Sequence, residues 1–330
     1  SQRLPYPGKR QLRTDLATFD AEVLTYGFQE TRNRVAREVK VAYYDLALVD
    51  ASTQIVLNNR TVLEQFLRTA EARYAAGQAT QADVLKAQTQ LGRMLDELLR
   101  LERERPSVEA ELIRAVGRYV SAPIRAQLPA AAAPHWQPDR LYEQALAQRP
   151  QLRGLEAAIA RAEKAIELAR KDYYPDFDVR LSYGQRDRAP DGMRRDDMVS
   201  LTVAINLPVW RESRLDPRVT ETIAMRDQSR QMYQAQLNDL RMRLRQQVAA
   251  VEQSFKSIQL YDTAILPQAR LAVEAAVAAY RVNRIEILSL LDSQMTVFGY
   301  ELSRVQAQAT LAKAMAEIEL LTGRTYEVQR

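Results

Sequence analysis

The stretch LSLLDSQMTVFGYELSRVQAQATLAKAMA, residues 288–316, places apolar or small side chains at alternating steps of three and four. These side chains are Leu288, Leu291, Met295, Phe298, Leu302, Val305, Ala309, Ala312 and Ala316. A sustained seven-residue period predicts a coiled-coil seam with left-handed supercoiling. A partner helix of similar period precedes it, at Leu237, Leu244, Val248, Val251, Phe255, Ile258 and Ile265. The sequence therefore predicts a long helical hairpin.

A matching hairpin lies in the first part of the chain, which makes the sequence an internal duplication. Residues of the first half recur at the same spacing in the second, namely Tyr74, Leu85 and Gln88 as Tyr280, Leu291 and Gln294. The seam of its first helix comprises Val35, Val39, Ala42, Leu46, Val49, Val56, Leu63, Leu67, Ala70 and Tyr74. The fold class is therefore mainly α, with antiparallel coiled-coil hairpins in two repeats.

The first helix has no strong breaker from Gln11 to Tyr74, and a helix of this extent would be roughly 95 Å long. We expect it to be interrupted or bent at Gly27 and at Asn58–Asn59. The corresponding helix of the second half should break at Pro267, because proline removes a backbone donor and clashes one turn back.

Each hairpin turns back at a short tip. Gly77 and Asn283 occupy equivalent places in the two tips, and both residue types tolerate the left-handed conformation that closes a helix. Thr80 can cap the returning helix of the first hairpin, with Asp83 three residues on completing a capping box. Both tips should therefore be tight turns.

Prolines and alanines crowd the stretch between the halves, which predicts a connector over residues 119–138. A shorter helix should follow over about residues 139–171, with a break at Arg149–Pro150. The predicted segments are 1–118, a first helical hairpin; 119–138, the connector; 139–174, a short helical segment; 175–210, a β-hairpin; and 211–330, a second helical hairpin.

After Pro175 the period of the apolar residues changes from helical to two. The alternating apolar side chains are Phe177, Val179, Leu181, Tyr183, Val199, Leu201, Val203, Ile205 and Leu207. They predict two strands of about ten residues, separated by a solvated loop over 184–197. Such two-faced strands suit a transmembrane β-hairpin whose nine apolar side chains face lipid. A soluble hairpin packed on helices is the alternative.

Composition removes several classes of function. The 330 residues include no cysteine and one histidine, His135, which leaves no material for disulfides, thiolate metal sites or His-based triads. No apolar run is long enough for a transmembrane helix. The charges, 47 basic and 42 acidic, form no basic patch with aromatics, so no nucleic acid is expected as a partner. Asp176 and Asp178 are interpreted as the water-facing start of a strand, and we expect neither an enzyme nor a cofactor or metal site.

The order of tips, heptads and strands resembles the TolC-type outer-membrane efflux proteins. The stretches that carry the resemblance are LPYPGKRQLR, YAAGQATQADVLKAQ, RPQLRGLEAAIARAEKAIELARKDYYPDFDVRLSYG, INLPVWRESR and YRVNRIEILSLLDSQ. It implies a homotrimer in the Gram-negative outer membrane, with a shared β-barrel in lipid and an α-barrel in the periplasm. Because LPYPGKR aligns with INLPVWR, a preceding β-hairpin is expected to be missing. The segment DDMVSLTVAINLPVWRESR looks most like the heavy-metal branch.

The resemblance also implies roles for individual residues. Positions on the adaptor-docking motif are Ala76, Gly77, Gln78, Val282, Asn283 and Arg284, with Asn283 in place of the usual glycine. Asp292 falls on an acidic ring that lines the closed entrance, and three copies would attract cations. Asp83 and Tyr280, with Arg284 beside the usual arginine position, fall where relatives hold neighbouring hairpins shut. Alternatively, Asp83 is only a cap and Tyr280 only a seam residue.

The function implied is a passive exit duct that receives solutes, heavy-metal cations among the candidates, from a periplasmic adaptor (membrane fusion protein) and an inner-membrane transporter. Opening would come from untwisting of the hairpins. The alternative is a soluble structural coiled coil without a membrane role.

Overall fold

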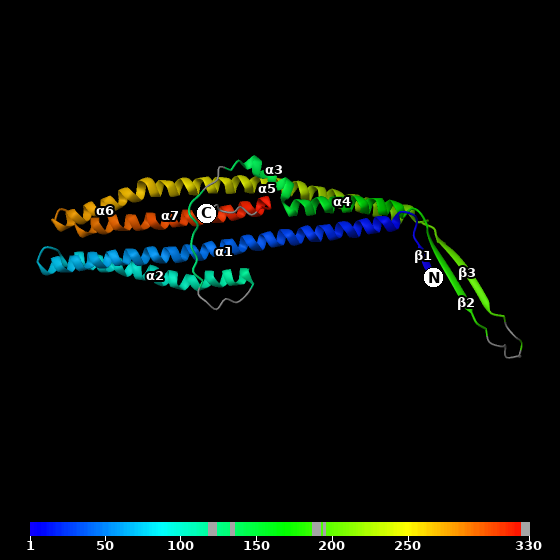
Figure 1. The fold of residues 1–330 in the computed structure, drawn as a ribbon, viewed down its shortest axis with the longest axis horizontal. Coiled ribbons are helices and arrows are strands. Elements are labelled where there is room, and N and C mark those ends of the chain that lie inside the picture. Colours follow the sequence, from blue (N-terminus) through cyan, green and yellow to red (C-terminus); the bar gives the residue numbers. More distant parts are fainter. Residues whose placement is uncertain (118–123, 133–135, 187–192, 194–195, 325–330) are drawn as a thin grey trace. The chain divides into compact units, whose positions relative to one another are not determined.

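The computed structural model describes residues 1–117, 124–132, 136–186, 193 and 196–324 (Figure 1). Its contacts form two compact units. Unit 1 comprises Ser1–Glu30 and Arg149–Asp239, and unit 2 comprises Thr31–Gln148 and Leu240–Arg330. In the part of the chain described, no helix combines the length and the apolar character that crossing a bilayer requires. His135 and most of the predicted loop at 184–197 lie outside the described residues.

Helices dominate both units. They are α1 (Lys9–Ala75), α2 (Gln81–Val116), α3 (Pro138–Gln148), α4 (Pro150–Lys171), α5 (Asp216–Leu260), α6 (Leu266–Arg281) and α7 (Ile287–Thr322). Two π-helical turns, Arg211–Leu215 and Tyr261–Ile265, precede α5 and α6. The strands are β1 (Gln2–Leu4), β2 (Asp176–Gly184) and β3 (Met198–Asn206).

The predicted helix breaks have different outcomes. The break at Arg149–Pro150 is confirmed, and the π-helical turn directly before α6 confirms the one at Pro267. The predicted interruption of α1 is wrong, because α1 continues for 67 residues through Gly27 and Asn58–Asn59. Asn59 is instead buried in the seam, where its side chain donates to Met94 Sδ at 3.0 Å and accepts from Gln294 Nε2 at 2.8 Å.

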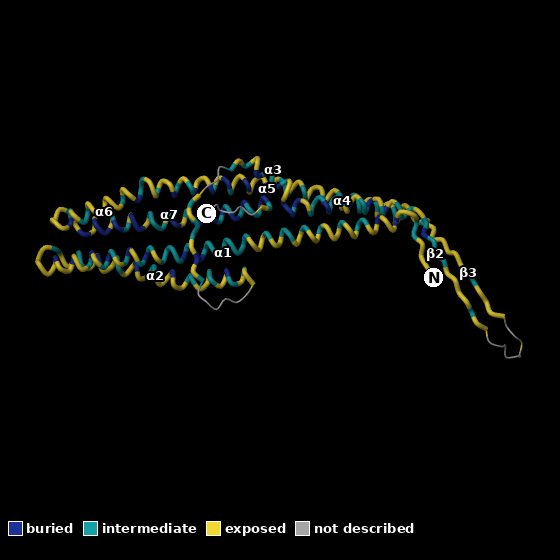
Figure 2. Tube along the Cα trace, viewed as in Figure 1, coloured by how far each residue is buried: buried dark blue, intermediate teal, exposed yellow. Residues whose placement is uncertain are grey.

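The core of unit 2 is a set of heptad stripes, which Figure 2 shows as buried segments along α1 and α7. Its most regular members are Val49, Val56, Leu63 and Ala70 of α1 and Ala87, Met94 and Leu101 of α2, each seven residues apart. Burial of each large apolar side chain here stabilises the folded state by roughly 1.5–3 kcal/mol. Three predicted seam residues, Val35, Tyr74 and Leu288, are exposed. Val35 lies before the first buried apolar residue of this stripe of α1, Ala42, and Tyr74 lies after the last, Ala70. In α7, Ile287 is buried instead of Leu288.

The connector after α2 is held against α1 by Arg105. Arg105 Nε lies 2.7 Å from Asp50 Oδ1, and its Nη2 donates to the carbonyl oxygen of Ile124 at 2.7 Å. Glu109 accepts a hydrogen bond from the Ile124 amide at 3.1 Å. Ala126 is buried beside Leu46. These contacts fix the backbone of a segment that lacks regular secondary structure.

The sheet of unit 1 is antiparallel, in the order β1-β2-β3. Four pairs face one another across β2 and β3, namely Phe177 and Ile205, Val179 and Val203, Leu181 and Leu201, and Tyr183 and Val199. Directly opposed residues share a face, so eight of the nine predicted lipid-facing side chains lie together. Leu207 follows the last residue of β3. β1 was not predicted; its Leu4 pairs with Phe177 and extends the same face.

Candidate functional site

The first hairpin tip closes at Gly77, whose φ of +71° is the left-handed conformation. The Gly77 amide donates to the carbonyl oxygen of Tyr74 at 2.9 Å, and the Gln78 amide donates to that of Arg73 at 2.8 Å. This pair of bonds is a Schellman motif, which satisfies carbonyl groups left open at the helix end. The motif confirms the predicted tight turn.

The second tip has the same geometry. Asn283, with a φ of +61°, donates from its amide to the carbonyl oxygen of Tyr280 at 3.1 Å. The Arg284 amide donates to the carbonyl oxygen of Ala279 at 2.9 Å. Asn283 therefore replaces glycine without a change of turn type, because asparagine tolerates this conformation better than other side chains do.

Thr80 and Asp83 form the predicted capping box at the start of α2. Thr80 Oγ1 accepts from the Asp83 amide at 3.2 Å, and Asp83 Oδ2 accepts from the Thr80 amide at 3.0 Å. The equivalent position of the second tip, Glu286, makes no side-chain cap. Asp83 is therefore a helix cap in the single chain, whatever further contacts it makes in an assembly.

Arg73 of α1 links the two tips. Its guanidinium donates to the carbonyl oxygen of Tyr280, to Asn283 Oδ1 at 2.8 Å and to the carbonyl oxygen of Gln78 at 3.4 Å. The same group lies 4.5 Å from the centroid of the Tyr280 ring, a cation–π distance. Arg73 is only 8% exposed. We call Arg73, Gln78, Tyr280 and Asn283 the tip cluster.

The sequence interpretation missed Arg73. The repeat could have shown it, because Ala279 occupies the matching place directly before Tyr280. An arginine next to a tyrosine in one half and an alanine in the other is the only signal, and its partner cannot be read from spacing.

Tyr280 is buried within the seam of unit 2, at 4% exposure. Burial raises its pKa above the ordinary value; Arg73 opposes this effect and Asp83 adds to it. Its hydroxyl group is buried and has no hydrogen-bond partner among the described residues. Tyr280 therefore stays neutral at physiological pH, and its ring acts as a packing surface for Arg73.

A groove of about 480 Å³ lies between the tips. It brings together most of the predicted gate and docking residues, namely Gly77, Gln78, Asp83, Tyr280, Asn283 and Arg284. Ala76 and Val282 are exposed in the same turns, Val282 at 64%. Asp292 does not line this groove; it lies exposed on α7.

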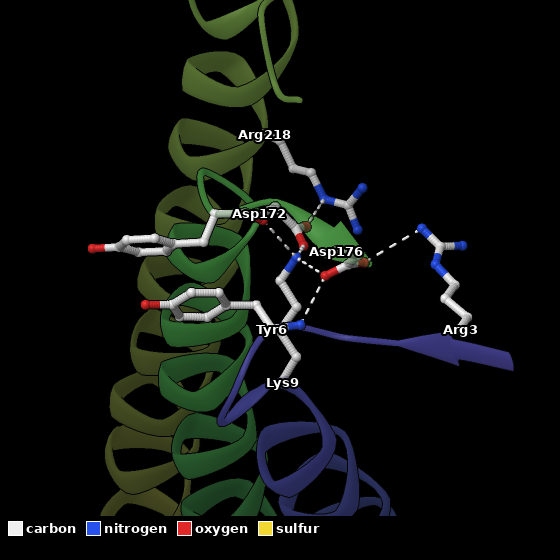
Figure 3. A network of polar contacts seen from close by, with 7 residues as sticks. Arg3, Tyr6, Lys9, Asp172, Asp176 and Arg218 are labelled. Atoms are coloured by element: carbon white, nitrogen blue, oxygen red, sulfur yellow. Dashed lines mark hydrogen bonds and ion pairs between the residues drawn. The ribbon is translucent and has the colours of Figure 1, made fainter. Parts of the chain in front are cut away.

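A second polar cluster joins the strands to the helices of unit 1 (Figure 3). Lys9 Nζ, on a side chain only 4% exposed, lies 2.8 Å from Asp176 Oδ1 and 3.4 Å from Asp172 Oδ1. Asp176 also accepts from the Tyr6 amide at 3.0 Å. The junction cluster comprises Arg3, Tyr6, Lys9, Asp172, Tyr174, Asp176 and Arg218. The interpretation of Asp176 as water-facing is wrong, because Asp176 is 6% exposed beneath these groups.

The chain thus combines long heptad hairpins that end in tight tips with a sheet that has one apolar face. These features allow comparison with known proteins. Residues 1–118 and 141–324 match the family described as outer membrane efflux protein. The chain belongs to this family. As an outer-membrane efflux protein it is placed in the Gram-negative outer membrane with its helices in the periplasm, and the soluble coiled-coil alternative is not supported.

Relatives of this efflux protein include the cobalt-zinc-cadmium resistance protein CzcC of Cupriavidus metallidurans. The two are 22% identical over 317 residues, which cover 96% of this chain and 74% of CzcC. The pyoverdine export outer membrane protein OpmQ of Pseudomonas aeruginosa is 25% identical over 291 residues. That match covers 83% of this chain and spans 59% of the length of OpmQ.

Solved structures share the fold of the efflux protein. The outer membrane protein VceC of Vibrio cholerae superposes with a TM-score of 0.86 at 18% identity, over 98% of this chain and 78% of VceC. The open state of the Neisseria gonorrhoeae channel MtrE gives 0.81 at 16% identity, over 96% and 72% of the two chains. Within the described ranges, no group of three or more His, Cys, Asp or Glu side chains is placed to hold a metal ion.

Proposed function

We propose that this efflux protein is the homotrimeric exit duct of a tripartite pump, in which adaptor and inner-membrane transporter deliver solute to it. The observation that carries the proposal is the β2–β3 register, which gathers the apolar side chains on one face. A sheet of this kind suits lipid on one side and water on the other, provided that neighbouring copies close its edges.

The duplication supports assembly from several copies. Leu291, Gln294 and Tyr280 of the second half are buried, whereas the matching residues Leu85, Gln88 and Tyr74 are exposed. The face that is buried in the second half is therefore exposed in the first half. This exposed face can be covered by a neighbouring copy of the chain. The mass of the detergent-extracted protein should therefore correspond to three protomers, and a monomer would contradict the proposal.

Single cysteines can test the proposed lipid and adaptor contacts, because the chain contains no cysteine. In intact membranes, Val203→Cys should be protected from a charged maleimide by lipid. Thr202→Cys, on the opposite face of β3, should react through the water-filled lumen.

A second pair of cysteines tests the proposed adaptor contact. Val282→Cys at the tip should crosslink to the adaptor, whereas Arg93→Cys, at an exposed position on α2, should not. Equal labelling of the two β3 positions, or equal crosslinking at both helical sites, would contradict the assignments.

Asp292 is proposed to form an anionic ring at the closed entrance. Its exposure in the single chain fits this role, since three carboxylates around an axis attract cations and resist close approach. Asp292→Ala should raise the ion conductance of reconstituted trimers and weaken block by multivalent cations. Asp96→Ala is the control, because it removes the same negative charge from an exposed position on α2. Unchanged conductance and block would remove Asp292 from the gate.

The cargo class is proposed to be divalent heavy-metal cations. The name of CzcC, cobalt-zinc-cadmium resistance protein, supports this assignment, while the name of OpmQ points to export of pyoverdine. An anionic entrance is suited to cations. Deleting the gene should lower the tolerance of the host to zinc or cobalt, and unaltered tolerance would contradict this cargo.

A further inference from the structure

We propose that Lys171, together with Tyr6 and Tyr174, binds the phosphate group of an anionic phospholipid at the periplasmic boundary of the membrane. The inference rests on the proposed placement of the β2–β3 hairpin in lipid. Tyr6 and Tyr174 stack with ring centroids 4.5 Å apart and planes inclined by 16°. Lys171 Nζ lies 5.5 Å from the Tyr6 centroid and 5.7 Å from the Tyr174 centroid. The two rings and the ammonium group thus form a compact cationic site.

The end of the Lys171 side chain lies in a confined place, between the tyrosine rings and Gly8. Gly8 has a φ of +90°, and a Cβ atom built there would lie 3.8 Å from Lys171 Cε and 3.9 Å from Nζ. The end of the lysine side chain therefore lies next to Gly8 as well as beside the rings. A cation that is already held in place loses less conformational freedom when it binds an anion.

Apart from the two tyrosine rings, Lys171 has no partner for its charge among the residues that the structure describes. The cations of the junction cluster, by contrast, have carboxylate partners: Lys9 contacts Asp172 and Asp176, Arg3 contacts Asp176 at 3.4 Å, and Arg218 contacts Asp172 at 3.8 Å. No carboxylate among residues with described positions forms an ion pair with Lys171. Its ammonium group is therefore available to an external anion.

The site lies where the apolar face of the sheet ends. Leu4 pairs with Phe177 at that edge. Tyr6 comes shortly after Leu4 in the chain, and Tyr174 comes shortly before Phe177. Figure 3 shows the hydroxyl group of Tyr6 pointing away from Asp176. Tyrosine rings and lysine ammonium groups are characteristic of the membrane–water interface, where lysine can form an ion pair with a lipid phosphate. A hydrocarbon-embedded apolar face thus puts Lys171 at the level of the head groups.

The test compares the intact efflux protein, extracted in mild detergent, with its Lys171→Gln variant. Binding of phosphatidylglycerol is measured by native mass spectrometry. Loss of one interfacial lysine should weaken binding about fivefold. Lys164→Gln is the matched control, since Lys164 lies on the same helix and pairs with Glu167 at 3.0 Å. Lys171→Arg should retain most of the affinity, which separates a charge effect from a folding defect.

Other outcomes overturn the inference. Equal phosphatidylglycerol binding by Lys171→Gln and Lys164→Gln removes the site. Competition by millimolar glycerol phosphate would make the ligand a free phosphate rather than a lipid. Flotation with liposomes separates this failure from that of the proposed function: wild-type protein that does not float contradicts both, whereas variants that float and bind lipid alike contradict only the lysine site.

Discussion

Lys9→Met is expected to lower the free energy of unfolding of unit 1 by about 3–5 kcal/mol. The Lys9 and Asp176 side chains are 4% and 7% exposed, so the substitution leaves a buried carboxylate with the exposed Arg3, at 3.4 Å, as its remaining cationic partner. Asp172, 26% exposed, loses the same partner and keeps Arg218 at 3.8 Å. Thermal unfolding of the detergent-solubilised protein, followed by circular dichroism, should show a clearly lower midpoint.

The matched control is Lys164→Met, which removes an exposed ion pair and should change stability by less than about 1 kcal/mol. Adding Asp176→Asn to Lys9→Met should recover part of the loss, because the buried negative charge that Lys9 no longer neutralises is then gone. Equal midpoints for Lys9→Met and Lys164→Met would show that the junction cluster does not stabilise the strands on the helices.

Arg73→Ala should have the largest effect on conduction. The substitution removes the donor of two hydrogen bonds that join the tips and of a third, to Gln78, within the first tip. It also removes the cation that packs on the Tyr280 ring. Hydrogen bonds from a charged donor contribute about 1.5–3 kcal/mol, and 1.4 kcal/mol corresponds to a tenfold shift between two states. Reconstituted trimers should therefore open about tenfold more often in planar-bilayer recordings.

Two further variants define the role of Arg73. Arg68→Ala removes an exposed arginine from the same helix and should leave the opening frequency unchanged. Arg73→Lys keeps the charge but lacks the planar guanidinium that reaches several acceptors at once, so we expect it to resemble Arg73→Ala. An opening frequency that is the same in Arg73→Ala and Arg68→Ala would exclude the tip cluster from the gate.

Features encoded by local periodicity could be predicted from the sequence. The period of two located β2 and β3, and the Gly77 and Asn283 positions located both tips. The prediction of an interruption at Gly27 failed because one glycine costs only about 1 kcal/mol, less than the surrounding turns of α1 supply. The prediction of an interruption at Asn58–Asn59 failed for another reason, because side chains of two other helices form hydrogen bonds with the Asn59 amide.

The polar clusters could not be predicted, because their members are far apart in sequence. Lys9 and Asp176 are separated by 167 positions, and Arg73 and Tyr280 by 207. Each charge looks solvated when only its own helix or strand is considered. Only the folded chain shows that the lysine and the arginine each have a buried partner.

The π-helical turn Tyr261–Ile265 changes which side of the rod is buried. Ile258 is buried before it, but the next buried apolar residue is Leu266 rather than the expected Ile265. The interval is eight positions instead of seven, so a heptad count carried across the turn is one residue out from there on. Since one residue corresponds to about 100° of rotation, α6 presents a different set of side chains to its neighbours than unbroken continuation of α5 would present.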